Sequence, residues 1–438
     1  MGSSAGAMFA CSSSDSELPG AGGYAGESLT GSAAGGVTNV GGGTVTRSGG
    51  ASAGTSAGGN VSIGGGGGAG GSGRASGGVI GGGGASQGGG AGSGAVGGGI
   101  GGSVGTGGAP SSGGSPGTGG STGSCTEPAP SPLVGWASVS GTGTPSTTGG
   151  DGGATTTVST LADLTAAVSG TTVRTVLISG SIDGSISIGS NKTLVGLCGA
   201  KFHGHIGLNK SVNVIVRNLT VVGYGCTDNP SDCSGGADAV TVQDAAHHLW
   251  FDHDDISDGS DGNLDLTHAA DFVTVSWTKF HYSGRRTDPA GASGGHQFSN
   301  LIGHSDSNAS EDTGHLRITF HHSWWADNVV ERMPRSRFGQ VHLFNNLYTA
   351  TGNDYCIGVG NGVSIRSDNN VFIGVANPIK SYSTDGTGVI LSTGNDYRNT
   401  TGSKTDVGSG TAFSPPYTVT LDSTATLEAA IRAGAGPR

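Results

Sequence analysis

The segment ITFHHSWW (residues 318–325) is followed by two segments of the same design, VHLFNNLY (residues 341–348) and SIRSDNNVFI (residues 364–373). Each begins with alternating apolar residues, continues with polar residues, often Asn, Asp, Ser or His, and ends in an apolar or aromatic pair. Two earlier segments, LWFDHDDI (residues 249–256) and VTVSWTKF (residues 273–280), repeat the pattern. Alternation with a period of two indicates a strand with one buried face, so each segment predicts two short strands joined at a polar bend.

Superposing these segments matches Phe251, Val275, Phe320, Leu343 and Ser367, at intervals of roughly 23 residues except for a longer one before Phe320 that contains an insertion. A repeat of this length that starts with a strand and lacks helical periodicity predicts a parallel β-helix, in which each coil buries its apolar side on the next. Asparagines at matching bends would then hydrogen-bond along the stack. A β-sandwich is the alternative, but the Asn-Gly hairpin signals that it needs are scarce.

Only two stretches have a convincing helical pattern. TVSTLADLTAAVSG (residues 157–170) is expected to form a helix that caps the open end of the β-helix, because its apolar residues recur at helical spacing. TATLEAAIRAGAG (residues 424–436) is expected to form a short closing helix.

The first 125 residues differ in composition from the rest. They hold more than half of the 91 glycines and almost no charged residues. Such a stretch has few side chains to pack and much backbone entropy to lose, so residues 1–125 are expected to form a flexible linker or tether. Residues 126–438 are rich in Val, Ile, Leu, Thr, Asn and Asp, and are expected to form one large domain.

The net charge of -11 at pH 7 restricts the partners of this chain. A surface of this sign repels nucleic acid and anionic membranes, so a polyanionic partner needs a local basic site. The chain has no apolar run long enough to span a membrane. Near its start, AMFAC followed by serines is similar to the end of a bacterial lipoprotein signal, with Cys11 as the lipidated residue. An ordinary linker behind a secretion signal is the alternative, and both place the domain outside the cytoplasm.

The cysteines show no paired spacing of a structural zinc site. Cys226 and Cys233 flank a short polar loop and are predicted to form a disulfide bond. Cys198 and Cys356 fit buried thiols equally well.

Three aspartates, Asp238, Asp261 and Asp265, lie close together around one predicted strand. A hard cation such as Ca²⁺ binds where several carboxylate or carbonyl oxygens converge, and successive coils can bring distant residues together. Aspartates in Gly-rich loops are also ordinary turn formers, so these residue types by themselves leave both interpretations open.

The segment ERMPRSRFG (residues 331–339) carries three arginines, Arg332, Arg335 and Arg337. In a strand Arg335 and Arg337 would point to the same face, with Arg332 at the bend before the proline. Guanidinium groups bind carboxylates in pairs of hydrogen bonds, so the cluster suits a polyanion such as a polyuronate. Structural ion pairs, for example with Glu331, are the alternative.

Several motifs in this chain resemble those of pectate lyase family 1, whose members are secreted enzymes. They cover residues 132–396 in the family's order: GSNKTLVGL, WFDH, DGNLDLTHAADFVTVSWTKF, SNLIGHSDS and GHLRITFHHSWWADNVVERMPRSRFGQVHLFNNLY. The resemblance implies a right-handed parallel β-helix and calcium-dependent β-elimination of polygalacturonate or low-methylated pectin. It also implies a bacterial enzyme, secreted or tethered to the cell surface, that acts as a monomer.

By the same resemblance, Asp238, Asp261 and Asp265 correspond to calcium-binding acids, Arg332 to the catalytic base and Arg337 to a substrate-binding arginine. Calcium would make the C5 proton of the bound uronate more acidic, and the base would remove it as the 4-O bond breaks. An arginine with a pKa above about 12 is a poor base. Neighbouring cations such as Ca²⁺, Arg335 and Arg337 are expected to lower the pKa of Arg332, and the activity is expected to be highest at alkaline pH.

The chain departs from the family pattern at three places. A substrate-binding lysine before the LIG segment is absent, with Phe298 near that position, and Arg285 or Arg286 is a candidate substitute. A further calcium-site acid is Gly236 here, which implies a leaner site. The usual HHN is HHS with Ser323, which is expected to remove one rung of the asparagine ladder.

Other aromatic and imidazole groups are interpreted as structural. The histidines at strand ends, His253, His321 and His322, are expected to stack or to form buried hydrogen bonds. The tryptophans Trp250, Trp324 and Trp325 are expected to pack in the core or the groove wall.

Three other functions remain open. A pectin lyase would act on methyl-esterified pectin without calcium. A polygalacturonase would hydrolyse the chain with paired carboxylates. A non-catalytic pectin-binding module would bind without turnover.

Overall fold

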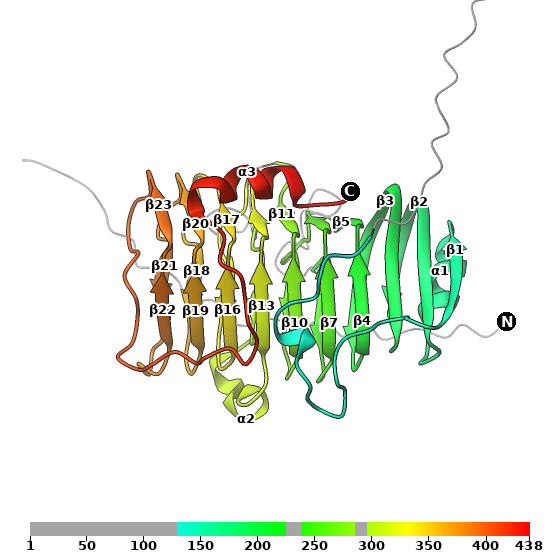
Figure 1. The fold of residues 1–438 in the computed structure, drawn as a ribbon, viewed down its shortest axis with the longest axis horizontal. Coiled ribbons are helices and arrows are strands. Elements are labelled where there is room, and N and C mark those ends of the chain that lie inside the picture. The colour runs from blue at the N-terminus through cyan, green and yellow to red at the C-terminus, as the bar shows by residue number, and fades with distance from the viewer. Residues whose placement is uncertain (1–128, 225–237, 285–295) are drawn as a thin grey trace, which may run out of the picture. The chain divides into compact units, whose positions relative to one another are not determined.

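The strands of this chain pair in parallel, coil upon coil. The computed structural model describes residues 129–224, 238–284 and 296–438, and Figure 1 shows their strands stacked along one long axis as a right-handed parallel β-helix. This confirms the predicted fold class. The strands fall into three columns of neighbours, here called sheets A, B and C, and one strand of each makes a coil.

Sheet A begins with two long strands that continue into the other sheets. Its strands, in order, are β1 (Ala154–Val158), β2 (Arg174–Ser187), β3 (Lys192–Asn209), β4 (Val212–Arg217), β7 (His247–Asp252), β10 (Asp271–Ser276), β13 (Arg317–His321), β16 (Gln340–Phe344), β19 (Ser364–Asp368) and β22 (Val389–Thr393).

Sheets B and C contain shorter strands. After the middle parts of β2 and β3, sheet B contains β5 (Thr220–Val222), β8 (Asp255–Ser257), β11 (Lys279–His281), β14 (Trp324–Trp325), β17 (Leu347–Tyr348), β20 (Val371–Ile373) and β23 (Asp396–Arg398). After the ends of β2 and β3, sheet C contains β6 (Val240–Gln243), β9 (Leu264–Leu266), β12 (Leu301–Ile302), β15 (Arg335–Ser336), β18 (Ile357–Val359) and β21 (Ile379–Ser381).

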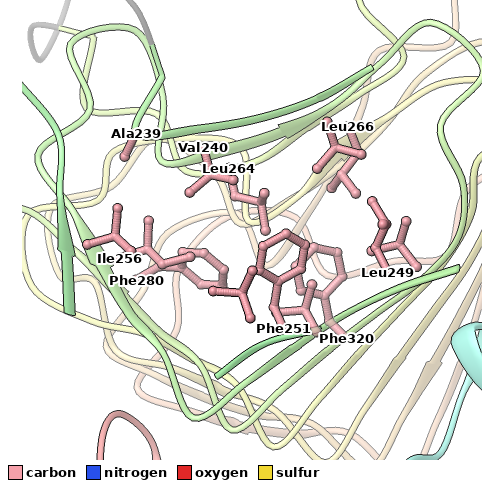
Figure 2. Packing of buried hydrophobic residues seen from close by; sticks show 14 of the residues in the cluster. Ala239, Val240, Leu249, Phe251, Ile256, Leu264, Leu266, Phe280 and Phe320 are labelled. Carbon is pink, nitrogen blue, oxygen red and sulfur yellow. The ribbon is translucent and has the colours of Figure 1, made fainter. Parts of the chain in front are cut away.

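The predicted repeat register is confirmed residue by residue. Phe251 pairs with Val275, Val275 with Phe320, Phe320 with Leu343, and Leu343 with Ser367. The matched side chains point into the core, where Figure 2 shows Phe251 and Phe320 packed together with residues from all three sheets. The period of two therefore placed both the strands and their buried faces correctly.

The bend between sheets A and B repeats one backbone conformation in successive coils. Its first residue has a positive φ, for example 53° at Asn345 and 49° at Asn369. The next residue is buried: Asn346 Nδ2 donates to the Phe320 carbonyl at 2.9 Å, and its Oδ1 accepts from the Ser323 N–H at 2.9 Å. Asparagine suits both positions, because it tolerates a positive φ and its amide can both donate and accept.

The predicted asparagine ladder is thus present. Asn370 repeats the bonds of Asn346 one coil later, accepting from the Asn346 N–H at 2.9 Å and donating to the Leu343 carbonyl at 2.9 Å. Ser323 reaches the Val275 carbonyl only at 3.5 Å, so the ladder is weak at this coil.

The histidines and tryptophans considered in the sequence analysis stack on other rings or pack in the core. His253 and His322 stack on either side of Trp277, with ring centroids 5.6 and 4.4 Å apart. Trp325 stacks on Tyr348 inside the core at 4.6 Å. The structural interpretation of these side chains is confirmed.

Helices lie at one end and along one side of the stack (Figure 1). α1 (Leu161–Val168) buries Leu164 and Val168 against the first strands and caps the β-helix as predicted. It starts later than expected, because residues before Val158 belong to β1. α3 (Thr424–Gly434) packs Leu427 on the outside of β17 and β20 instead of on an end of the stack. Three short helical turns are η1 (Trp136–Ser138), η2 (Asp306–Asn308) and α2 (Ala309–Asp312).

The predictions for the cysteines have different outcomes. Of the two cysteines whose state the sequence left open, Cys356 is a buried free thiol and Cys198 is disulfide-bonded. The predicted Cys226–Cys233 bond, the lipidated Cys11, Gly236 and the candidate substitutes Arg285 and Arg286 lie outside the described residues, as does the predicted linker of residues 1–125. In the part of the chain that is described, no helix is long and apolar enough to cross a membrane.

Candidate active site

Sheet C carries the predicted site on its outer face. Its register aligns one outward-facing position from each strand: Thr241, Asp265, Leu301, Arg335, Gly358 and Lys380. The alternate positions point inward, where Leu264 and Leu266 are fully buried. Parallel strands lie about 4.8 Å apart. This row therefore brings one acidic residue, Asp265, and two basic residues, Arg335 and Lys380, close together although they are far apart in the sequence.

The three predicted calcium-site aspartates occupy one end of this row. Asp265 lies within β9, Asp261 precedes that strand and Asp238 precedes β6, the neighbouring strand. A Cβ atom on Gly262 would lie 2.8 Å from Asp238 Oδ1 and 3.1 Å from Asp265 Oδ1, so both carboxylates point at the same glycine. The coils thus bring together residues that the sequence grouped only by type.

Hydrogen bonds orient part of this acidic cluster. Asp265 Oδ1 accepts from the Leu301 N–H at 2.9 Å, and Asp261 Oδ1 lies 3.3 Å from His296 Nδ1. His296 was not predicted. Asp238 Oδ1 is buried and has no hydrogen-bond partner within the described chain.

The carboxylates of Asp238, Asp261 and Asp265 repel one another, and Asp238 and Asp265 are buried. Burial, together with the charges of Asp265 and Asp261, raises the pKa of Asp238 well above its ordinary value. Burial also raises the pKa of Asp265, to about 7, although the charge of Arg332 opposes this. Converging carboxylates, one with an unpaired buried oxygen, are the donor set that a hard divalent cation requires. The residues present therefore fit a calcium ion.

Arg332 lies beside the acidic cluster. It has a positive φ of 61°, and its guanidinium lies 4.1 Å from the ring centre of Phe298. Phe298 bridges Gly262 on one side and Glu331 on the other, so it connects the acidic cluster to the arginine segment. Arg332 Nε is buried without a hydrogen-bond partner within the described residues.

The charges of the protein itself do not lower the pKa of Arg332. Burial by itself lowers this pKa, but interactions with Tyr355, Asp265 and Asp261 outweigh it and raise the pKa above the ordinary arginine value. The expectation considered the cations around Arg332, whereas its nearest charges across the coils are carboxylates.

Arg335 and Arg337 do not share one open face as expected. β15 ends at Ser336, and Arg337 is only 2% exposed. Its Nε donates to Asp306 Oδ1 at 2.8 Å, and a terminal nitrogen donates to the Gly303 carbonyl at 2.9 Å. Arg337 thus anchors the segment after β12.

Arg335 lies on the outer face of sheet C with Lys380. The Arg335 guanidinium stacks over Tyr382 at 4.4 Å, and Lys380 Nζ pairs with Asp354 at 2.8 Å. Sequence reasoning missed Lys380 because only the register places it two strands from Arg335.

Comparisons with known proteins agree with this architecture. A family model described as pectate lyase matches residues 122–437. The chain belongs to the pectate lyase family. A probable pectate lyase B of Aspergillus flavus is 40% identical over 238 residues, covering 52% of this chain and 64% of that protein. Pectate lyase A of Aspergillus niger is 35% identical over 291 residues, covering 64% and 80%.

A solved structure extends the likeness to the fold of a bacterial protein. The pectate lyase of Bacillus sp. N165, determined in complex with trigalacturonate, superimposes with a TM-score of 0.57 at 25% identity, over 70% of this chain and 98% of that one. For the Aspergillus flavus relative the match spans slightly less than two thirds of its length. The family resemblance noted in the motifs is therefore confirmed across the β-helix.

Proposed function

We propose that this pectate lyase family member cleaves polygalacturonate or low-methylated pectin by calcium-dependent β-elimination. The observation that carries the proposal is the acidic cluster on sheet C, where Asp238, Asp261 and Asp265 interact with Arg332. An acid cluster beside cations suits a polymer whose every sugar bears a carboxylate, because an ion can bridge protein and substrate carboxylates while arginines bind further ones. The bound trigalacturonate of the Bacillus structure supports this substrate class.

In this proposal the aspartates hold calcium, which when bound acts as a Lewis acid toward the substrate carboxylate and acidifies the C5 proton. Asp265 is fixed by the Leu301 N–H, which limits its movement when the ion binds. The raised pKa of Asp238 and Asp265 means that protons compete with the cation, so affinity for calcium should increase with pH.

Arg332 is proposed to remove the C5 proton. Burial lowers its pKa, whereas interactions with Tyr355 and with the carboxylates that would hold the ion raise it, and neutralising those carboxylates would reduce that rise. Phe298, stacked on the guanidinium, holds its plane and excludes water from that side. Arg337 is proposed to contact the substrate or to support the substrate-binding surface through its bond to Asp306. Arg335 and Lys380 are proposed to bind substrate carboxylates further along the row.

The proposal is tested with the full chain on polygalacturonate by following the ultraviolet absorbance of the unsaturated product. Arg332→Ala should lower kcat by roughly 100-fold or more, the usual contribution of a positioned proton acceptor. Arg432→Ala, on the exposed side of α3, is the matched control and should keep the parent rate. EGTA should abolish the activity.

Other outcomes identify the alternatives. Activity on esterified pectin that persists in EGTA would indicate a pectin lyase. New reducing ends without an absorbance increase would indicate a hydrolase. Binding without turnover, unchanged in Arg332→Ala, would indicate a non-catalytic module.

We also propose that the enzyme is exported and acts as a monomer, with residues 1–125 as a tether of the domain that begins at residue 126. The lipoprotein-like motif at Cys11 supports attachment to the cell surface. Mass spectrometry of the N-terminus of protein isolated from its host tests this: a diacylglycerol adduct on Cys11 is expected, and an unmodified or absent Cys11 would contradict it.

A further inference from the structure

A second cluster of metal-ligating side chains lies beside the excursion between β12 and β13. One ligand atom each from His268, His304 and Glu311 lies within 4.8 Å of the others. His268 belongs to the turn after β9, and the other two belong to the excursion that includes η2 and α2, visible in Figure 1 at the edge of the stack. None of these residues belongs to the acidic cluster of sheet C.

The imidazoles of His268 and His304 lie close enough together for one ion to contact both. The rings of His268 and His304 stack with centroids 4.1 Å apart, and His268 Nδ1 lies 3.0 Å from Glu311 Oε2. His304 Nδ1 is buried without a hydrogen-bond partner among the described residues.

The backbone around the cluster is held in place. Asp312, fully buried, accepts from the Ala269 N–H at 2.8 Å and so attaches the excursion to the turn that carries His268. Its other oxygen, Oδ2, is buried and also lacks a partner within the described part of the chain. This buried carboxylate interacts electrostatically with His304 and His268, and its unpaired oxygen favours a cation nearby.

Ligand chemistry selects the class of cation. Two imidazoles and one carboxylate suit Zn²⁺ or a similar first-row transition ion, whereas Ca²⁺ prefers oxygen ligands alone. The Glu311 side chain is 41% exposed and the His268 side chain 24%, so the cluster is open to ions from solvent and leaves a position for water.

We propose that His268, His304 and Glu311 form a binding site for Zn²⁺ or a similar transition-metal ion, separate from the calcium site. The ion replaces the hydrogen bond between His268 and Glu311 and connects the turn after β9 to the excursion. The same excursion supplies Asp306 and the Gly303 carbonyl to Arg337, so the ion also rigidifies the surroundings of that arginine.

The test is calorimetric titration of the full chain with Zn²⁺ in buffer containing saturating Ca²⁺, together with thermal unfolding at each Zn²⁺ concentration. One ion per chain and a melting temperature that increases with Zn²⁺ are expected. His304→Ala and Glu311→Gln should each weaken binding at least about 10-fold. Glu311→Gln keeps the fold testable, because this side chain is largely exposed.

Two controls separate this site from others. His203→Ala removes an exposed histidine that pairs with Asp183, far in the fold from the proposed zinc ligands, and Asp238→Asn removes a member of the acidic cluster, so neither should change Zn²⁺ affinity. The proposal is overturned if the parent shows no saturable binding, if Glu311→Gln and His304→Ala bind as the parent does, or if Asp238→Asn abolishes binding.

Discussion

Replacing Gly262 by alanine tests whether the acidic cluster of sheet C is a calcium site. The added Cβ would lie 2.8 Å from Asp238 Oδ1 and 3.1 Å from Asp265 Oδ1, whereas ordinary contacts begin at 3.4 Å. The two carboxylates must therefore move apart by about 0.6 and 0.3 Å to restore van der Waals contact. Binding sites tolerate displacements of only about 0.5 Å.

A displacement of this size should raise the calcium dissociation constant about 10-fold, equivalent to about 1.4 kcal/mol. The measurement is calorimetric titration with Ca²⁺, supported by the calcium dependence of the lyase rate on polygalacturonate. At saturating calcium the rate should recover most of the parent value, because Arg332 is not touched by the substitution.

Gly207→Ala is the matched control. Gly207 lies one strand before Thr241 in the same row of sheet C, and an added Cβ there meets nothing closer than 3.5 Å. It should keep the parent calcium affinity. A Gly262→Ala variant that is folded and binds calcium as tightly as the parent would refute the argument, since the carboxylates could not then be the ion's ligands.

Two further predictions concern stability. Asn346→Ala leaves the Ser323 N–H and the Phe320 carbonyl unpaired in the core and should cost about 3 kcal/mol, whereas Asn395→Ala, in a half-buried rung, should cost about 1 kcal/mol. Urea unfolding followed by circular dichroism measures both, and equal costs would contradict the ladder's role. Burial, then the neighbouring His322, lowers the pKa of His321 to about 3. Below its ordinary value of 6.5 the unfolded chain binds a proton that the folded chain excludes, so the contribution of His321 to the free energy of unfolding should be constant above pH 6.5 and fall towards pH 3 by about 1.4 kcal/mol per pH unit. His321→Gln should reduce that slope, and an unchanged slope in this variant would contradict the assignment.

The fold could be predicted from local pattern. The five matched residues from Phe251 to Ser367 are neighbours in sheet A as expected, because alternation and polar bends are properties of each coil and every coil repeats them. α1 was placed correctly as the cap. The first residues of the stretch predicted to be helical, Thr157 and Val158, belong instead to β1, where pairing with β2 overrides helical propensity.

The site could be predicted only in part. Residue types and family motifs pointed to Asp238, Asp261, Asp265 and Arg332, which the coils bring together. Arg337 was expected to point to the same face as Arg335, but it is buried, because Asp306 and the Gly303 carbonyl of the segment after β12 bind it. No spacing rule indicated Lys380 in the row of Arg335, because their relation comes from strand register.

The sequence by itself determined the repeat, the buried faces and the chemical types available, since these follow from short-range periodicity and composition. Tertiary structure alone decided which charges face one another. The pKa of Arg332 is the clearest case: its neighbours in the chain include two arginines, which would lower this pKa, yet stacking sets Arg332 beside Tyr355, Asp265 and Asp261 from other coils, and interactions with them raise it. The electrostatic energy between two charges depends on the distance between them in space. In a β-helix, a residue lies closer to its neighbours in the adjacent coils than to many residues of its own segment.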